Sequence, residues 1–508
     1  MQKPRAISNS IVIGLIAFHL AIALPLAFSL NIWMDEGSSL YTTQQGFFSA
    51  FQNAASNEKQ APLYFWILSV WRLADDSIFF ARLFSVFCGI ASIALFARFC
   101  SRVFEPRAAL LASSFFALHP FLIWTSLEIR GYAFVVTLTI LLITFFFYGF
   151  TREDGDTLQS QIAFVIVAIV SLYTNYYLGF LFAGFFAALI VTRNWKSARD
   201  YVLFMLIVAI AFVPLVATVG SQFAAKTSSF RDSISALDAF RTLWHHTTTY
   251  MLPGQFLDSS PDSQFATVRV WVVRIGALSL LALLAVTYKK ISQCTLILAA
   301  IAFAAFVGVF AAGYWMNPNY MQLRHATPLF VPFVLFVASL CSDIFISVSE
   351  RITKAITLTV GLLVLISFSY SLTTLYPNSA KRGDWARVGA FIQENESPGQ
   401  PILVFTTFDA LTLPYHYYGV NKILPDEKFF EFEQEAAFGT ENSLKKQTEF
   451  VISEIPADAE MIWLVVNEKC LVTDACRPLE NYVHANYTIE KEQEFYLEKL
   501  FLLRKKTQ

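Results

Sequence analysis

Long runs of apolar residues alternate with short polar and charged segments over the first three quarters of the chain. About 20 consecutive apolar residues cross a bilayer as an α-helix, so the pattern predicts a polytopic membrane protein. A further apolar segment, 61–74, is too short to cross comfortably and is predicted to be re-entrant or interfacial. About 11 to 13 transmembrane helices are expected. Eleven crossings are assigned, and two more would leave the number of crossings odd, so the predicted orientation would not change. The eleven predicted crossings are 8–30, 79–100, 108–127, 131–150, 161–175, 177–192, 201–219, 267–288, 292–313, 326–345 and 355–375.

After residue 375 the long apolar runs end. Short apolar segments bounded by turn residues predict β-strands at 401–405, 461–466 and 495–503. Asp384 can cap a helix that runs to about residue 395, and a second helix is predicted at 443–454. The predicted fold class is therefore an all-α polytopic membrane domain, residues 1–375 with an outer loop at 31–78, followed by a small α/β soluble domain, residues 376–508.

Charge divides the chain at the same point. The 508 residues are 56% hydrophobic and carry a formal net charge of −1. Residues 1–375 contain 23 Lys and Arg against 17 Asp and Glu, whereas residues 376–508 contain 14 against 21. The tail is therefore acidic, which argues against nucleic acid or an anionic membrane surface as its main partner.

Basic residues in the short loops predict the orientation, because Lys and Arg concentrate on the cytoplasmic side. With the N-terminus inside, these loops alternate consistently, and the loop 31–78 and the tail are extracytoplasmic. No small-residue cleavage site follows the first apolar run, so a removable signal peptide is not expected. The expected location is a bacterial inner membrane. The cytoplasmic basic residues are Lys3, Arg5, Arg98, Arg102, Arg107, Arg193, Lys196, Arg199, Lys289, Lys290, Arg351 and Lys354.

Cys470 and Cys476 are the only cysteines of the tail. A disulfide suits a close pair in an extracytoplasmic domain. Two unpaired thiols are an equal alternative, since the sequence alone does not establish pairing.

An adjacent acidic pair, Asp35 and Glu36, follows the first apolar run by about five residues. Charge at a membrane surface usually marks function. The predicted topology places further charged and polar residues on the same outer side, and their mixture of cations and acids suits an anionic substrate. They are Lys59, Glu128, Arg130, Arg324 and His325.

The predicted spans themselves hold almost no ionisable residues. His19 and His119 are the nearest, and a packed, hydrogen-bonded role is the more common one for such a histidine. A transporter would instead place charge near the bilayer midplane and show interrupted helices and inverted repeats. A membrane scaffold with an acidic tail and a polymerase or ligase that uses a diphosphate donor are further alternatives.

Each candidate residue also has a structural alternative. Asp35 and Glu36 could form an exposed loop pair, and Glu128 could be a plain salt-bridge partner. Lys59, Arg130 and Arg324 could be snorkelling interface anchors. The aromatic candidates could belong to an interfacial belt, since the chain has 51 Phe, 20 Tyr and 10 Trp.

Ordered motifs give the chain a resemblance to a known family. It resembles the glycosyltransferases of the GT-C fold that use lipid-phosphate sugars, in particular the dolichyl-phosphate-mannose–protein mannosyltransferases and bacterial relatives such as the aminoarabinose transferases. The resemblance covers about 8–375 and is strongest over 31–150. The chain departs from common family residues at Gln60-Ala61, Asn175 and His325. The motifs are Asp35-Glu36, Lys59 with Ala61-Pro-Leu-Tyr64-Phe-Trp66, Glu128-Ile-Arg130-Gly-Tyr132, the turn Tyr173–Tyr177, and Arg324-His325 with Pro328.

The resemblance implies a hexosyl- or pentosyltransferase that moves a sugar, with inversion, from a polyprenyl-phosphate donor to an extracytoplasmic acceptor among protein, lipid or glycan. It implies Asp35 as the general base, which can contribute roughly 10²–10⁴-fold. Glu36 would orient the acceptor or, in a metal-using relative, help to bind a cation such as Mg²⁺ or Mn²⁺.

The remaining motif residues are then expected around the donor. Lys59, Arg130 and Arg324 would bind the donor phosphate, with Arg offering a bidentate fork. Glu128 would fix the rotamer of Arg130. The expected substrate-lining residues are Tyr64, Trp66, Glu128, Tyr132, Tyr176 and His325.

Overall fold

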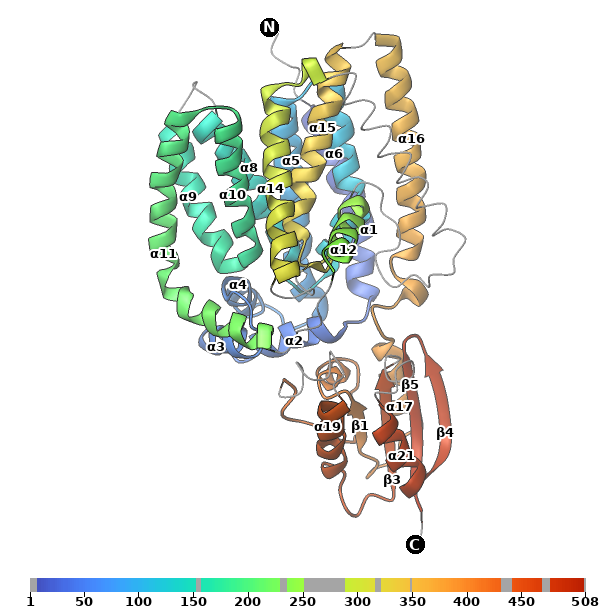
Figure 1. Cartoon of the computed structure of the whole chain (residues 1–508). Helices are drawn as coiled ribbons and strands as arrows, with labels where there is room; N and C mark the ends of the chain where they lie inside the picture. The colour runs from blue at the N-terminus through green and yellow to red at the C-terminus, as the bar shows by residue number, and fades with distance from the viewer. Residues whose placement is uncertain are drawn as a thin grey trace. The chain divides into compact units, whose positions relative to one another are not determined.

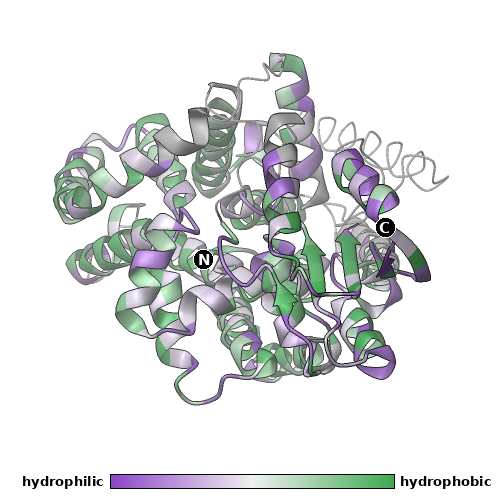
Figure 2. Cartoon of the chain, turned by 90° about the horizontal axis from the view of Figure 1, so that it is seen from below, coloured by the Kyte–Doolittle hydropathy of each residue, from purple (hydrophilic) through white to green (hydrophobic). Residues whose placement is uncertain are grey.

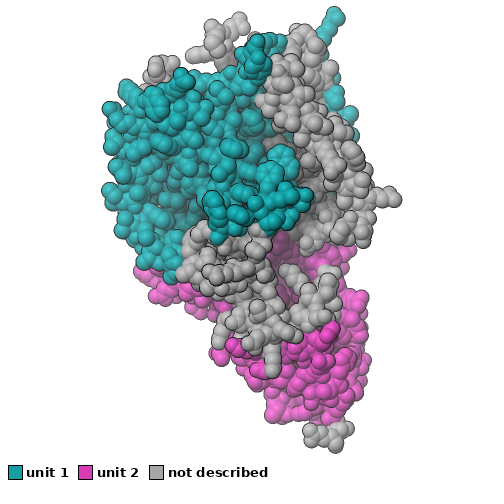
Figure 3. Space-filling model, in the orientation of Figure 1, with its two compact units in different colours: residues 1–27, 59–375 teal, residues 28–58, 376–508 magenta. Residues whose placement is uncertain are grey.

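The computed structural model divides the chain into two compact units (Figure 3). Unit 1 comprises residues 1–27 and 59–375, and unit 2 comprises residues 28–58 and 376–508. The structure describes residues 7–151, 157–228, 235–250, 288–315, 321–347, 350–430, 441–467 and 476–506.

Unit 1 is built of helices, many of them long and apolar (Figure 1). Within the described residues, seven helices are long and apolar enough to cross a membrane, and the bent pair α6–α7 makes an eighth. They include the predicted crossings from 8–30 to 161–175 and those at 201–219, 292–313 and 326–345. The predicted crossing 177–192 is a shorter apolar helix, and 267–287 lie outside the described residues.

The helices of unit 1 have the following bounds: α1 Asn9–Ser29, α4 Leu63–Trp71, α5 Ile78–Val103, α6 Pro106–Leu118, α7 Pro120–Leu127, α8 Tyr132–Phe146, η1 Phe147–Thr151, α9 Thr157–Thr174, η2 Tyr176–Leu178, α10 Gly179–Val191, α11 Trp195–Ser228, α12 Ala236–Thr249, η3 Tyr288–Lys290, α14 Gln293–Trp315, η5 Thr327–Leu329, α15 Phe330–Ser347 and α16 Glu350–Thr374. The nine-residue α4 occupies the segment that the sequence predicted to be too short to cross.

Local sequence fixes where several of these helices start. The Ser77 hydroxyl accepts a hydrogen bond from the Phe80 amide at the start of α5, and Glu105 accepts two from backbone amides at the start of α6. Such caps satisfy amides that have no partner within the helix. The α6–α7 pair bends by 43° at His119-Pro120, because proline cannot continue the hydrogen-bond ladder of the preceding helix.

Aromatic stacking and close backbone approach hold the helices of unit 1 together. Phe116 of α6 stacks between Phe96 of α5, at 4.1 Å, and Phe330 of α15, at 5.4 Å. A Cβ on Gly184 of α10 would lie 2.9 Å from the backbone of Ile301 in α14. Small residues of this kind allow membrane helices to approach closely.

Unit 2 contains a five-stranded sheet in the order β2-β1-β3-β5-β4. Strand β1 is parallel to β2 and β3, while β5 is antiparallel to β3 and β4. The register pairs Val404 with Val465 and Leu464 with Phe501. The strands are β1 Ile402–Phe405, β2 Ile423–Leu424, β3 Met461–Asn467, β4 Tyr487–Phe495 and β5 Glu498–Lys505, and the helices are α2 Met34–Thr43, α3 Phe47–Ser56, η6 Pro377–Ser379, α17 Trp385–Asn395, η7 Asp409–Leu411, η8 Leu413–Tyr415, α19 Glu441–Ser453 and α21 Arg477–Asn486.

Both faces of this sheet are covered. Along β3, Leu464 and Val466 pack into one core cluster, with Val451 of α19, whereas Trp463 packs into another with Trp385 of α17. Burial on both faces explains the continuous apolar run of this strand. Figure 2 shows hydrophobic strands side by side.

The predicted α/β class of the tail is confirmed, and strands and helices lie close to the predicted segments. Two details differ: residues 495–503 span the end of β4, a turn and most of β5, and Asp384 precedes α17 without a side-chain capping hydrogen bond. The sequence did not predict β4, because its middle is charged and exposed and it joins the sheet edge through its backbone. Cys476 is disulfide-bonded, and the predicted partner Cys470 lies outside the described residues. Among the described cysteines, Cys88, Cys100, Cys294 and Cys341 are not part of a disulfide.

The division between units differs from the predicted domains in one respect. The boundary after residue 375 coincides with the predicted one, but residues 28–58 group with the soluble tail and not with the membrane helices. The reason is tertiary: Tyr41 of α2 packs against Phe429 and Phe430, and polar contacts described below tie the start of α2 to residues 381–416. No apolar periodicity encodes such contacts.

Candidate functional site

The acidic pair begins helix α2 in unit 2. Trp33 is the N-cap residue, and its amide donates to Oε2 of Glu36 at 3.4 Å, as in a capping box. Asp35 is 6% exposed and Glu36 is fully buried, so the alternative of an exposed loop pair does not hold. Negative charge is stabilised at a helix N-terminus, so this position suits a carboxylate side chain.

Glu36 forms a buried ion pair. Its Oε1 lies 2.8 Å from Nζ of Lys381, and the two side chains are 0% and 1% exposed. The Asn31 side chain accepts from the Lys381 amide at 2.8 Å and donates to the Lys381 carbonyl at 3.1 Å. The carboxylate predicted to act beside Asp35 is thus held by the soluble part of the chain.

A third buried carboxylate on this loop, Glu58, was not among the predicted residues. Its Oε1 accepts hydrogen bonds from the hydroxyls of Ser38, at 2.5 Å, and Thr42, at 3.2 Å. Ser38 and Thr42 lie one turn apart on α2, so Glu58 faces the same helix that carries Asp35. The signal was present in the sequence, because Glu58 directly precedes the predicted Lys59.

In unit 1, two of the motifs meet. A Cβ on Gly131 would lie 3.3 Å from Cγ of Tyr64, so the Tyr64 ring packs directly on the turn that carries Arg130. That turn links α7 to α8, and the Ser85 hydroxyl of α5 donates to the Glu128 carbonyl at 2.6 Å.

The residues of this turn are buried, and one of them stacks on a neighbouring ring. Glu128 and Arg130 are 1% and 7% exposed, so Arg130 is not an exposed interface anchor. Tyr132 stacks on Trp124 with centroids 5.3 Å apart. Trp66 is half-buried on α4, on the same short helix as Tyr64.

The last motif meets the predicted turn near residue 175. The ring of His325 stacks on Tyr177, with centroids 5.4 Å apart. Arg324 is half-buried and donates through Nε to Oε1 of Gln322 at 2.9 Å. Helix η5, which follows His325, packs against α8, which begins at Tyr132. The neighbouring Tyr176 hydroxyl is buried and has no hydrogen-bond partner among the described residues.

Lys59 lies in the turn before α4, with a φ of 51°. Its neighbour Gln60 accepts a hydrogen bond through its carbonyl from Gln222 at 3.4 Å. Unit 1 therefore brings Tyr64 together with the turn 128–132, and His325 together with Tyr177. Asp35 and Glu36 belong to unit 2, so their convergence with the cations of unit 1 stays a prediction.

The span histidines have structural roles, as the sequence favoured. His119 accepts from the Phe121 amide through Nδ1, so its Nε2 carries the proton and donates to the Tyr250 carbonyl at 3.0 Å. His19 contacts the Ala117 carbonyl and the Ser126 hydroxyl. In the part of the chain that the structure describes, no group of three or more His, Cys, Asp or Glu could hold a metal ion.

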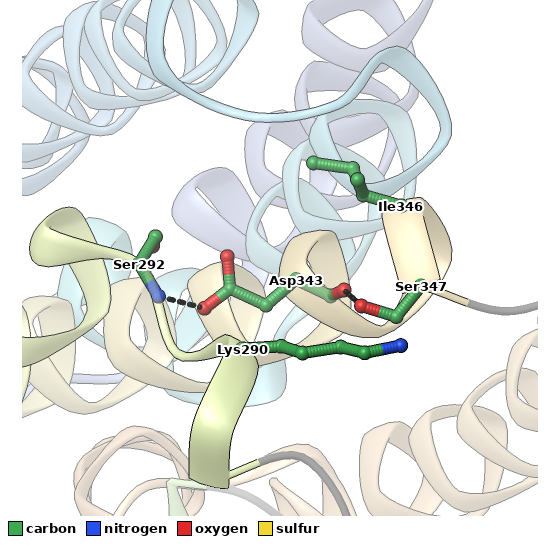
Figure 4. A pocket seen from close by; sticks show the side chains of 5 residues that line it. All are labelled: Lys290, Ser292, Asp343, Ile346 and Ser347. Atoms are coloured by element: carbon green, nitrogen blue, oxygen red, sulfur yellow. Dashed lines mark hydrogen bonds between the residues drawn. The ribbon is translucent and has the colours of Figure 1, made fainter.

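A pocket of about 480 Å³ lies at the far end of α15 from Arg324 (Figure 4). Asp343 lines it and accepts through Oδ2 from the Ser292 amide, at 2.9 Å, and from the Thr295 hydroxyl, at 2.7 Å. Asp343 therefore caps the start of α14 and links it to α15. The predicted topology places this pocket on the cytoplasmic side, away from the motif residues.

Comparison with known proteins identifies the segment that carries these motifs. The family model "Dolichyl-phosphate-mannose-protein mannosyltransferase" matches residues 59–217, a range that includes Lys59, Tyr64, Arg130 and Tyr176. No curated protein sequence matches the chain.

Two kinds of solved structure are similar to the chain. ArnT from Cupriavidus metallidurans, bound to undecaprenyl phosphate, is 13% identical, with 98% of each chain covered and a TM-score of 0.47. The oligosaccharyltransferase of Archaeoglobus fulgidus is 11% identical, with 91% of this chain and 68% of that chain covered and a TM-score of 0.48. Both TM-scores are below 0.5, so the functional conclusions below rest on the family match over residues 59–217.

The long apolar helices and the family match make the chain an integral membrane protein of the glycosyltransferase type. The resemblance that the motifs predicted is confirmed, because the family model "Dolichyl-phosphate-mannose-protein mannosyltransferase" matches residues 59–217, about a third of the chain.

Proposed function

We propose that the protein transfers a sugar from a polyprenyl-phosphate donor to an extracytoplasmic acceptor, with inversion at the anomeric carbon. The observation that carries this proposal is the family match over residues 59–217, which contain Lys59 and the turn 128–132. A lipid-linked donor also explains why these motifs lie in a unit built of membrane helices. The acceptor is a hydroxyl or amine group on a protein, lipid or glycan.

Asp35 acts as the general base in this proposal. The attacking acceptor group must lose a proton as it bonds to the anomeric carbon, and the Asp35 carboxylate accepts that proton. Its place in the first turn of α2 supports the role, because the N-terminus of the helix stabilises the ionised carboxylate that a base requires. General-base catalysis contributes roughly 10²–10⁴-fold.

Arg130, Arg324 and Lys59 stabilise the departing phosphate. Arg130 is supported most directly, because it is nearly buried and its turn packs on Tyr64. A guanidinium in a partly dry site interacts more strongly with a developing phosphate charge than one in water.

The transfer reaction can be tested with full-length protein reconstituted in lipid. Labelled polyprenyl-phosphate sugars are supplied, and label released to water or moved to an acceptor is measured. Asp35→Asn is expected to lower kcat by about 10²–10⁴-fold with the unfolding temperature retained. Wild-type turnover in folded Asp35→Asn would remove Asp35 as the base, and failure to cleave any polyprenyl-phosphate sugar would remove the donor class.

A further inference from the structure

The start of α2 is fixed by a segment of the chain about 350 residues further on. Glu36 and Lys381 form an ion pair with almost no exposure to water. A buried pair is stable only while both partners are present, since removal of one leaves an uncompensated charge in the interior. The second oxygen of Glu36 accepts from the Trp33 amide, so the same carboxylate joins the helix start to Lys381.

Hydrogen bonds of Asn31 and Ile32, which precede α2, fix the position of the segment that contains Lys381. The Asn31 side chain bonds to both backbone groups of Lys381 and donates to the Gly383 carbonyl at 2.6 Å. The Ile32 amide donates to Nε2 of His416 at 3.1 Å. These hydrogen bonds fix the residues that lead directly into α2.

Two further contacts orient α2. The guanidinium of Arg382 lies 4.3 Å from the ring centroid of Trp33, a cation–π distance. A Cβ on Gly37 would lie 2.8 Å from the Leu411 carbonyl oxygen, so only glycine allows this approach of α2 to η7. All these contacts lie within unit 2 and surround the position of Asp35.

We propose that Lys381 is a positioning residue: through its buried pair with Glu36, the soluble domain holds α2 so that Asp35 meets the acceptor. This inference rests on the proposed function. A misplacement of about 1 Å at a reacting group can lower a rate by roughly 10²-fold. The role of Glu36 is then to bind Lys381, in place of the acceptor or cation role that the resemblance implied.

The test uses full-length protein in lipid, with kcat and donor KM measured on a labelled polyprenyl-phosphate sugar. Lys381→Met is expected to lower kcat by about 10–10²-fold with donor KM nearly unchanged, and Lys381→Arg is expected to retain most of the activity. Lys422→Met is the matched control, because Lys422 forms an exposed ion pair with Asp426 in the same unit, and it is expected to match wild type.

A double variant keeps the test decisive if Lys381→Met does not fold. Glu36→Leu with Lys381→Met leaves no unpaired buried charge, so it is expected to fold and to show a higher kcat than folded Lys381→Met or Glu36→Leu alone. Independent, multiplicative losses in the double variant would overturn the proposal. Wild-type kcat in folded Lys381→Met, or a raised donor KM with kcat unchanged, would overturn it as well.

Asp35→Asn separates this inference from the proposed function. If Asp35→Asn is inactive and Lys381→Met is fully active, the positioning role alone fails. If Asp35→Asn is fully active, the assignment of the base fails, and the positioning role fails with it.

Discussion

The imidazole ring of His325 lies nearly parallel to the phenol ring of Tyr177, with the two planes 13° apart and the centroids 5.4 Å apart. One ring precedes η5 and the other lies in the short helix η2, so the stack joins two motifs that are about 150 residues apart in the sequence.

This stack is expected to contribute measurably to stability. A double-mutant cycle with Tyr177→Ala and His325→Ala should give a coupling free energy of about 0.5–1.5 kcal/mol, measured by unfolding in detergent. His325→Tyr should keep most of the stability, since a phenol ring can occupy the same plane. A cycle between Tyr177→Ala and Phe48→Ala is the control, because Phe48 is 84% exposed in unit 2. Equal coupling in both cycles would contradict a specific stack.

Gly131 is expected to be sensitive to a larger side chain. Gly131→Ala places a methyl group 3.3 Å from the Tyr64 ring, and overpacking of this kind costs about 1–3 kcal/mol. The ring must move with the turn that carries Arg130, so donor KM should rise along with the loss of stability. Gly14→Ala is the matched control, because a Cβ on Gly14 meets no atom within 4 Å and alanine favours the helix. A Gly131→Ala variant as stable and active as Gly14→Ala would show that Tyr64 does not pack there.

Asp343→Ala is expected to loosen the junction of α14 and α15. The change leaves the Ser292 amide without its cap and removes an acceptor from the Thr295 hydroxyl. The expected loss is about 1–3 kcal/mol, seen as a lower unfolding temperature. Lys290→Met alters the same pocket without touching the cap and should leave the unfolding temperature unchanged. An equal effect of the two changes would argue against the capping role.

Asp384→Asn is expected to stabilise the soluble unit at neutral pH. Burial raises the pKa of Asp384 above its usual value, and the neighbouring Arg387 offsets only part of this effect. The native state therefore binds the Asp384 proton more tightly than the unfolded chain does, so Asp384 costs stability as the pH rises above its unfolded pKa.

The gain in unfolding temperature from Asp384→Asn should be largest near pH 7 and should vanish below about pH 4, where both forms are neutral. Unfolding followed from pH 4 to pH 7 checks this, with wild type as reference. A lower unfolding temperature of Asp384→Asn at pH 7 would mean that the ion pair with Arg387 outweighs the burial of Asp384.

The sequence by itself determined most of the helical architecture. Runs such as 79–100 and 292–313 are as long as the membrane is thick, so their length alone specifies helices such as α5 and α14. The β3 strand was also predictable, because its residues are buried on both faces and form a continuous apolar run. The family resemblance was predictable too, since Lys59, Tyr64 and Arg130 stand in ordered motifs within the range that the family model matches.

Only the tertiary structure decided which distant residues contact each other. Glu36 and Lys381 are 345 residues apart, and neither residue's neighbours in sequence mark the pair. The same holds for β4, whose charged residues join the sheet through backbone hydrogen bonds that any side chain permits. Periodicity records which face of an element is buried, whereas a single ion pair or hydrogen bond between distant segments leaves no repeating pattern in the sequence.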